Sequence, residues 1–146
     1  MLKKGIKRLV DEAEAEIETI DIEAAKHLVD DEDTVIVDLR DIRELWNVGT
    51  IPGSVHAPRG MLEFWVDPES PYHRDVFSSG KKLVFFCAAG WRSALATKAL
   101  KPLPHTTTVS PPSALPPRSR KITSLVTAVA TIGWVARLVT ELVSGL

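Results

Sequence analysis

Residues 34–40 read TVIVDLR, a run of apolar, mostly β-branched side chains that ends in charged residues. A continuous apolar run, without alternating polar positions, is typical of a strand that is buried on both faces of a parallel sheet. A second such run, KKLVFFCA, occupies residues 81–88, and RSALATKALK at 92–101 has the alanine and leucine content of a helix. Strands that alternate with helices indicate an α/β fold with a parallel sheet.

Shorter elements are expected around these two runs. Asp41 and Glu44 form a D-x-x-E pattern, which predicts a capping box at the start of a short helix, DIRELWNV. SVHAP at 54–58 predicts a short strand, and MLEFWV at 61–66 predicts another short helix. Apolar residues at three- and four-residue spacing predict an amphipathic helix over 2–17 that packs against the body of the domain.

Length and composition restrict the classes of function. A chain of 146 residues fits one ordinary domain. Its 18 basic and 19 acidic side chains nearly cancel, so the overall charge does not predict a nucleic-acid partner. The charged, amphipathic N-terminus lacks the features of a signal peptide, and a single cysteine cannot form an internal disulfide. A cytoplasmic location is therefore expected.

The single cysteine, Cys87, ends the second strand run and begins the loop CAAGWRS, residues 87–93. In parallel sheets, functional sites collect where strands end and helices begin. A thiol attacks as the thiolate, and an ordinary cysteine with a pKa of ~8.5 is mostly protonated at neutral pH. Backbone N–H groups of residues 88–93, together with the positive end of the next helix, would stabilise an anion there.

The side chains of this loop predict a nucleophilic site for an anionic substrate. Gly90 permits a tight turn, and Arg92 supplies a planar cationic fork for a thiosulfonate, phosphate or arsenate group. Ser93 can cap the helix or donate to the same anion. Cys87 would attack and form a covalent intermediate on sulfur. The expected substrate-binding residues are Ala88, Ala89, Gly90, Trp91, Arg92 and Ser93. In the alternative interpretation, Cys87 is simply a buried apolar residue at the end of a strand.

Two separated motifs resemble those of the rhodanese family of sulfurtransferase domains. VDLRDIRELWNVGTIPGSVHAP, at 37–58, is similar to the family's V-D-x-R, acidic-residue, G-H-I-P-G-A and N-I-P series, with Thr50 in place of the usual histidine. The second motif is the loop at 87–93. The resemblance spans roughly residues 20–101 and implies a rhodanese-like α/β fold, with a parallel sheet flanked by helices.

The resemblance implies a sulfurtransferase of the thiosulfate:cyanide type. Cys87 would accept a sulfane sulfur from a small anionic donor such as thiosulfate, become a persulfide, and pass the sulfur to cyanide or to a thiol, including a protein thiol. In the family, four residues between the cysteine and the arginine accompany sulfur transfer and five accompany phosphatases; this chain has four. An arsenate reductase, a phosphatase and a non-catalytic binding module stay open as alternatives.

Asp38 and Arg40 match the first motif, and a salt-linked pair of these residues is expected to support the active loop. In the alternative interpretation, this pair has a purely structural role. No cofactor is expected. His56 and His73 have no partner ligand at a metal-binding spacing, so the sequence predicts no metal site.

The resemblance ends near Lys101. A rhodanese domain continues with a last parallel strand, a glycine-rich turn and a tryptophan-bearing helix, whereas six of the ten prolines of this chain lie between 102 and 117. The last strand and helix are therefore missing or replaced. TTTV at 106–109 is the only nearby β-prone piece and is a candidate for that strand.

The expected organisation is a rhodanese-like catalytic domain at 1–101, a linker rich in proline, serine and threonine at 102–121, and an apolar C-terminal segment at 122–146. Residues 122–140 hold a single charge, Arg137, and approach the length of a membrane span, although several threonines and serines argue against one. Membrane association through this segment is the alternative to a cytoplasmic location. A native extension and the product of a shifted reading frame are the other interpretations.

Overall fold

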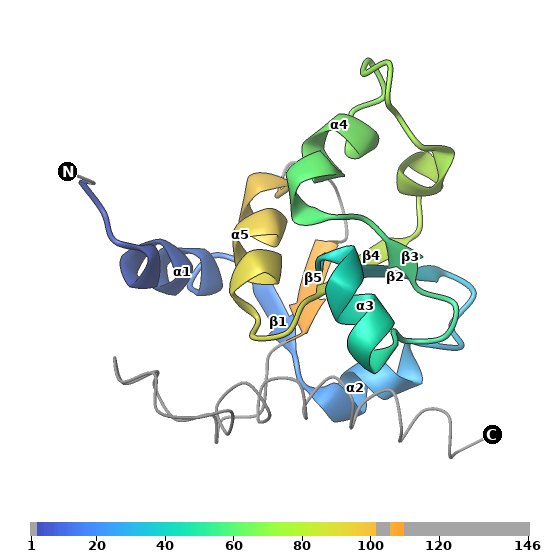
Figure 1. Cartoon of the computed structure of the whole chain (residues 1–146), viewed down its shortest axis with the longest axis horizontal. Helices are drawn as coiled ribbons and strands as arrows, with labels where there is room; N and C mark the ends of the chain where they lie inside the picture. The colour runs from blue at the N-terminus through green and yellow to red at the C-terminus, as the bar shows by residue number, and fades with distance from the viewer. Residues whose placement is uncertain (1–2, 102–105, 110–146) are drawn as a thin grey trace.

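The computed structural model describes residues 3–101 and 106–109 and contains, within them, a five-stranded parallel sheet in the order β1-β5-β4-β2-β3 (Figure 1). The strands are β1 (Glu18–Ile20), β2 (Thr34–Asp38), β3 (Val55–His56), β4 (Lys82–Phe86) and β5 (Thr106–Val109). The helices are α1 (Ile6–Glu14), α2 (Ile22–His27), α3 (Ile42–Val48), α4 (Leu62–Val66) and α5 (Trp91–Ala99), with short 3₁₀ turns at Arg59–Met61 and Asp75–Ser78. This arrangement confirms the predicted α/β fold.

Side chains of β2 and β4 are buried on both faces of the sheet, which explains why their sequences do not alternate between apolar and polar residues. Odd-numbered positions, such as Val37 and Phe85, pack with α4 and α5, whereas even-numbered positions, such as Ile36 and Val84, pack with α2. Figure 1 shows α4 and α2 on opposite sides of the sheet. The two apolar clusters fix the register of both strands, since a one-residue shift would exchange their faces.

Strand β5 lies where the resemblance predicts a last parallel strand. Thr106–Val109 pairs in parallel with β4 on one side and with β1 on the other, so this strand lies inside the sheet. Thr107, Thr108 and Val109 are almost completely buried, and the Thr108 hydroxyl donates a hydrogen bond of 3.1 Å to the carbonyl of Phe85. The expectation that TTTV replaces this strand is confirmed. The sheet therefore includes four residues from the range 102–121 that the sequence assigns to a linker.

The N-terminal helix is shorter than predicted. The periodicity predicts a helix over 2–17, whereas α1 spans Ile6–Glu14. Gly5 precedes it with extended backbone angles, and Ile17 lies in a turn before β1. Val10 and Ala13 are buried, and the helix packs against α5, as expected.

The capping box at the start of α3 is present as predicted. The Asp41 side chain accepts from the backbone N–H of Arg43 at 3.0 Å, and the Glu44 side chain accepts from the backbone N–H of Asp41 at 3.1 Å. Asp41 also accepts a side-chain hydrogen bond from Arg43, which lowers the pKa of Asp41 to about 2. Glu44 is thereby fixed at the carboxyl edge of the sheet, where β2 ends.

The predictions for the apolar segment at 122–146, including membrane association and a shifted reading frame, lie outside the described residues. Between residues 3 and 101 and across 106–109, none of the helices combines the length and the apolar character that a membrane crossing requires.

Shortening Val109 should lower stability because this side chain lies in the apolar cluster beneath β4. Val109→Ala is expected to reduce the free energy of unfolding by roughly 1–3 kcal/mol, through lost burial and a residual cavity. Urea unfolding followed by circular dichroism measures the change. Thr19→Ala, at an exposed position of β1, is the control and should change stability little. An unchanged midpoint for Val109→Ala would contradict the central position of β5.

Candidate active site

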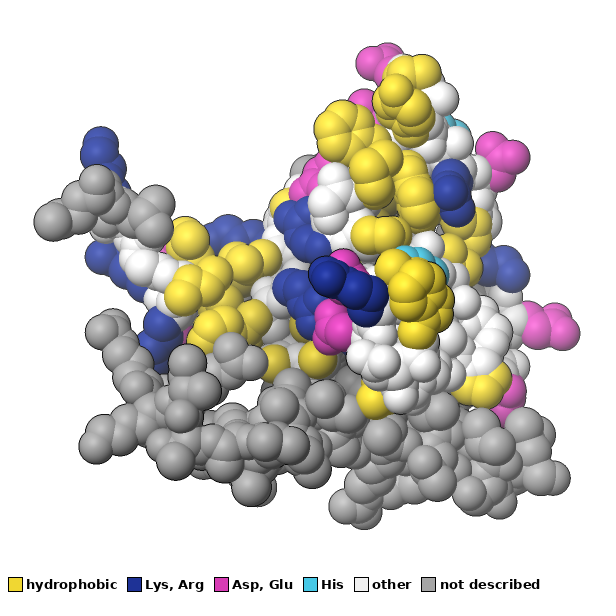
Figure 2. Space-filling view, viewed as in Figure 1, with side chains coloured by type: hydrophobic (Ala, Val, Ile, Leu, Met, Phe, Trp, Pro, Cys, Tyr) yellow, Lys and Arg dark blue, Asp and Glu magenta, His cyan; other side chains and the backbone are white. Residues whose placement is uncertain are grey.

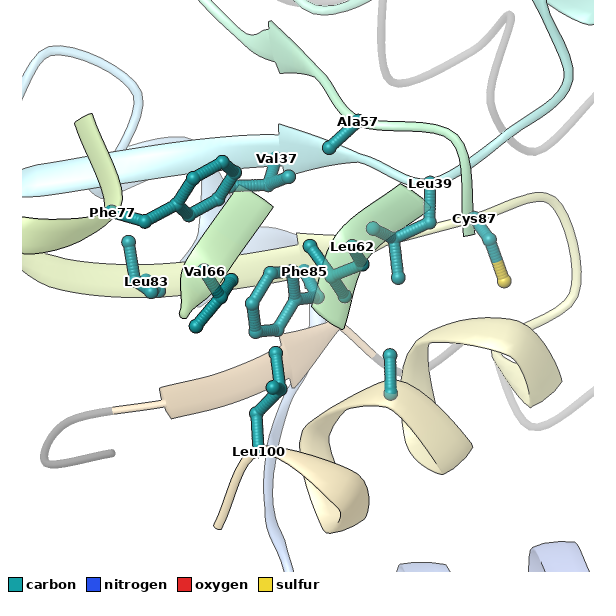
Figure 3. Packing of buried hydrophobic residues seen from close by; sticks show 11 residues of the cluster. Val37, Leu39, Ala57, Leu62, Val66, Phe77, Leu83, Phe85, Cys87 and Leu100 are labelled. Carbon is teal, nitrogen blue, oxygen red and sulfur yellow. The ribbon is translucent and has the colours of Figure 1, made fainter. Parts of the chain in front are cut away.

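Cys87 directly follows β4, at the carboxyl edge of the sheet, and is 1% exposed. It forms the end of the apolar cluster that contains Leu39, Leu62 and Phe85. In Figure 3 its sulfur points away from the other labelled side chains and toward α5. The Cys87 Sγ atom lies 3.6 Å from the Oγ atom of Ser93, which is itself fully buried. The hydroxyl of Ser93 is therefore a polar neighbour of a thiol that otherwise borders the apolar cluster.

The loop between β4 and α5 depends on the left-handed conformation of Gly90. Its φ of 78° is accessible to glycine at little energetic cost and lets the chain turn directly into α5. Ser93 Oγ donates to the carbonyl of Gly90 at 2.9 Å and fixes this turn. Among the described residues, the N–H groups of residues 88–93 have no hydrogen-bond acceptor. Those of 91–93 are the unpaired donors that every α-helix leaves in its first turn.

Arg92 is joined to Glu44, a residue 48 positions earlier in the chain. Nη1 donates to Oε2 at 2.6 Å, and Nη2 donates to Oε1 at 2.9 Å, so the carboxylate occupies the edge of the guanidinium between these two nitrogens. The two side chains are about one-third exposed, at 37% and 35%. This bridge connects the first turn of α3 with the first turn of α5.

The bridge changes the acidity of both partners. The hydrogen bonds from Arg92 lower the pKa of Glu44, against the opposing effect of partial burial. The hydrogen bonds to Glu44 are the main cause that raises the pKa of Arg92, and the neighbouring Cys87 side chain raises it further. Near neutral pH the carboxylate and the guanidinium are therefore both charged. A positive charge is fixed close to the sulfur of Cys87.

Asp38 and Arg40 form a buried ion pair, with Nη2 of Arg40 2.6 Å from Oδ2 of Asp38. Their side chains are 0% and 1% exposed, so the charges depend on their own hydrogen bonds for compensation. Arg40 also donates to the carbonyl of Gly49 at 2.8 Å, and Thr50 Oγ1 donates to Asp38 at 2.7 Å. The guanidinium lies 5.4 Å from the ring centroid of Phe86, the residue before Cys87. The pair thus contacts the strand that carries the loop.

Residues 21–110 match the family model of the rhodanese-like domain, which is more than half of the 146-residue chain. The chain belongs to the rhodanese-like domain family. No curated protein matches the sequence. The structure resembles a Rhodopseudomonas palustris protein of unknown function that is described as "Possible Tyrosine Phosphatase", with 45% sequence identity and a TM-score of 0.71. That alignment covers 75% of this chain and 86% of the other.

Two single-domain sulfurtransferases have a similar structure. The human protein TSTD1 is 27% identical, with a TM-score of 0.50 over 63% of this chain and 88% of its own. The Saccharomyces cerevisiae protein RDL2 is 19% identical, with a TM-score of 0.50 over 75% of this chain and 86% of its own. The likeness to the yeast protein shows the fold alone.

The rhodanese-like fold brings most of the predicted site residues together. Ser93 contacts both Cys87 and the carbonyl of Gly90, and Arg92 lies close enough to Cys87 for that side chain to raise the pKa of Arg92. Ala88 and Ala89 are half-buried in the loop. Trp91 is 39% exposed at the start of α5, consistent with a position at the mouth of the site. Asp38 and Arg40 form the predicted pair.

Two residues have contacts that the sequence did not predict. The sequence predicts Glu44 only as a capping-box residue, since no spacing rule relates it to Arg92. Thr50 replaces the histidine usual in the family, and the sequence predicts no partner for it; its hydroxyl donates to Asp38 and lies 3.0 Å from Ser54 Oγ. A short polar side chain at position 50 thus still completes the hydrogen bonds of the buried carboxylate.

The two histidines singled out in the sequence each have a polar contact through Nε2. His56 Nε2 donates to the carbonyl of Arg40 at 2.9 Å, and His73 Nε2 lies 2.8 Å from Ser78 Oγ. Across residues 3–101 and 106–109, no three His, Cys, Asp or Glu side chains are grouped so that they could hold a metal ion.

The Glu44–Arg92 bridge can be tested by titrating the carboxyl group of Glu44 with NMR. In the wild-type protein its pKa should lie below the ordinary value of 4.5, and Arg92→Ala should raise it because the two charged donors are removed. Arg59→Ala, which breaks the separate bridge to Glu63, should leave the titration of Glu44 unchanged. If Arg92→Ala did not move the midpoint, the bridge would not be populated in solution.

Proposed function

We propose that this rhodanese-like domain is a sulfurtransferase in which Cys87 carries the transferred sulfur as a persulfide. The proposal rests above all on one observation: the sulfur lies beside Arg92 and at the start of α5, where six backbone N–H groups have no acceptor among the described residues. Such donors stabilise an anion without a general base. The likeness to the human single-domain sulfurtransferase supports this type of activity.

In the first step, the Cys87 thiolate attacks the outer sulfur of thiosulfate. A new S–S bond forms, and the bond between the two sulfur atoms of thiosulfate breaks with its electron pair on the departing sulfite. The charge on the enzyme passes from the thiolate to the terminal sulfur of the persulfide. The N–H groups of the loop and the guanidinium of Arg92 would stabilise that charge.

In the second step, a thiolate acceptor or cyanide attacks the terminal sulfur. The acceptor gains the sulfur as a persulfide or as thiocyanate, and the bond electrons return to Cys87 as thiolate. The cycle needs no cofactor. A thiol on a protein partner fits the same step, since only its sulfur has to reach the loop.

Ser93 can serve both states of the sulfur. Its hydroxyl donates to Gly90 in this structure and can accept from the Cys87 thiol, 3.6 Å away. Once the thiolate forms, rotation of the hydroxyl would direct its hydrogen toward sulfur. The burial of Cys87 requires reactants to approach from the side of Arg92 and Trp91, where the loop is partly exposed.

Phosphatase activity is the second candidate, because the R. palustris protein that is 45% identical is described as a possible tyrosine phosphatase. Phosphate ester cleavage by a cysteine needs an acid to protonate the leaving oxygen. Glu44, the carboxyl group joined to Arg92, has a lowered pKa and is ionised near neutral pH, so it is a poor proton donor. The four-residue spacing between Cys87 and Arg92 also favours sulfur over phosphate.

Replacing Cys87 with serine should abolish sulfur transfer while leaving the fold intact. Incubation with thiosulfate is expected to add one sulfur atom to the wild-type protein, and cyanide should remove it; Cys87→Ser should show neither change. Intact-protein mass spectrometry measures the adduct, and the rate of thiocyanate formation should fall by more than roughly a thousandfold.

A variant with the thiol moved elsewhere provides the matched control. Cys87→Ser combined with Ser79→Cys retains one cysteine, but at an exposed position outside the loop. It should form no stable persulfide if the loop is what stabilises the terminal sulfur. Sulfur transfer by Cys87→Ser within tenfold of the wild-type rate would remove Cys87 from the mechanism. Hydrolysis of a phosphate ester by the wild-type protein without sulfur uptake would favour the phosphatase.

Arg92 should contribute mainly to the binding of the sulfur donor, thiosulfate. Arg92→Ala is expected to raise the KM for thiosulfate by roughly tenfold to a hundredfold with a smaller effect on kcat, because a charged contact to the sulfonate is lost. Steady-state kinetics measure both constants. The double variant Arg92→Ala/Glu44→Gln tests whether an unpaired Glu44 causes the effect, and Arg59→Ala controls for loss of an arginine elsewhere. An unchanged KM in both Arg92 variants would contradict its anchoring role.

A further inference from the structure

The Nη1–Nη2 edge of the Arg92 guanidinium is occupied by a carboxylate of the same chain. The two hydrogen bonds of 2.6 Å and 2.9 Å to Glu44 use one nitrogen each, in the arrangement that arginine also adopts with phosphate and other oxyanions. A carboxylate and an oxyanion therefore compete for the same edge of the guanidinium. One of them has to leave before the other can bind there.

Glu44 is held on its own side of the bridge. Its Oε2 atom accepts from the backbone N–H of Asp41 at 3.1 Å, as part of the capping box of α3. A carboxylate in the first turn of a helix is additionally stabilised by the unpaired N–H groups there. The carboxylate is thus anchored independently of Arg92, so an incoming anion has to draw Arg92 away from a fixed competitor.

We infer that Glu44 determines the specificity of the loop by competing with oxyanions for Arg92. The inference deepens the proposed function, since it concerns which reactants the Cys87 loop accepts. Reactants that place a sulfonate or a phosphate on this edge of Arg92 bind at the expense of the bridge. Reactants whose negative charge lies on sulfur alone can use the loop N–H groups and leave the bridge intact.

The position of the bridge distinguishes it from the other arginine pairs of the described residues. Arg59 and Glu63 lie four residues apart, and Arg43 and Asp41 lie two apart, so both pairs are local and exposed. The Glu44–Arg92 bridge instead joins the first motif to the active loop. Figure 2 shows Lys or Arg side chains next to Asp or Glu side chains near the centre of the viewed face, where α3 lies in Figure 1. Among the ion pairs within residues 3–101 and 106–109, this is the one that includes a residue of the loop at 87–93.

Inorganic sulfate is a suitable probe because it keeps its charge near neutral pH and undergoes no reaction with the protein. Its affinity can be measured by NMR from the backbone N–H signals of residues 88–93 in the full chain, at constant ionic strength. Glu44→Gln removes the negative charge, yet glutamine still accepts the Asp41 N–H bond, so α3 keeps its capping box. Glu44→Gln should bind sulfate roughly fivefold to fiftyfold more tightly than the wild-type protein.

Glu63→Gln is the matched control, since it makes the same substitution in a bridge to another arginine. It should leave sulfate affinity unchanged, and adding Arg92→Ala to Glu44→Gln should remove the gain. Equal affinities of the wild-type protein and Glu44→Gln would overturn the inference, as would weaker binding by Glu44→Gln, which would mean that Glu44 organises the anion site. Because sulfate binding needs no turnover, this result is independent of whether Cys87 transfers sulfur.

Discussion

The parallel pairing of β4 with strands on both sides is the constraint on which the site depends. Its backbone groups bond to β2 and β5, and its side chains are buried against helices on both faces, so the strand has no freedom to shift. Cys87 follows directly at the carboxyl edge. The position of the sulfur is therefore set by the most strongly restrained strand of the domain, whereas the loop after it is free to present N–H groups.

Polar contacts connect the carboxyl edge of the sheet with the loop at 87–93. The buried pair of Asp38 and Arg40 is satisfied by Thr50 and by the carbonyl of Gly49, and it lies against Phe86. These bonds matter because an unpaired charge inside the protein costs several kcal/mol, on the order of 3–5. They fix the segment from which α3 starts, and α3 in turn carries Glu44 to Arg92.

The arrangement at Arg92 bears on the choice between sulfur and phosphate chemistry. The positive charge near Cys87 suits any anion, so it does not separate the two reactions by itself. The ionised Glu44 favours the proposed sulfur transfer, because sulfite leaves thiosulfate without a proton, whereas the leaving oxygen of a phosphate ester needs one. The negative charge of Glu44 also partly neutralises Arg92, which weakens the attraction between Arg92 and an anionic substrate.

The sequence by itself determined the α/β class, the two buried strands, the capping box at Asp41 and the loop that starts at Cys87, because these features depend on local patterns of two to ten residues. It also predicted TTTV as a candidate strand, although the surrounding prolines argued for a linker. Only the tertiary structure placed those four residues between β1 and β4, since a central position depends on partners about 25 and 90 residues away. The Glu44–Arg92 bridge and the bond from Thr50 to Asp38 likewise required the fold, because no sequence period relates side chains that meet only when helices and strands pack together.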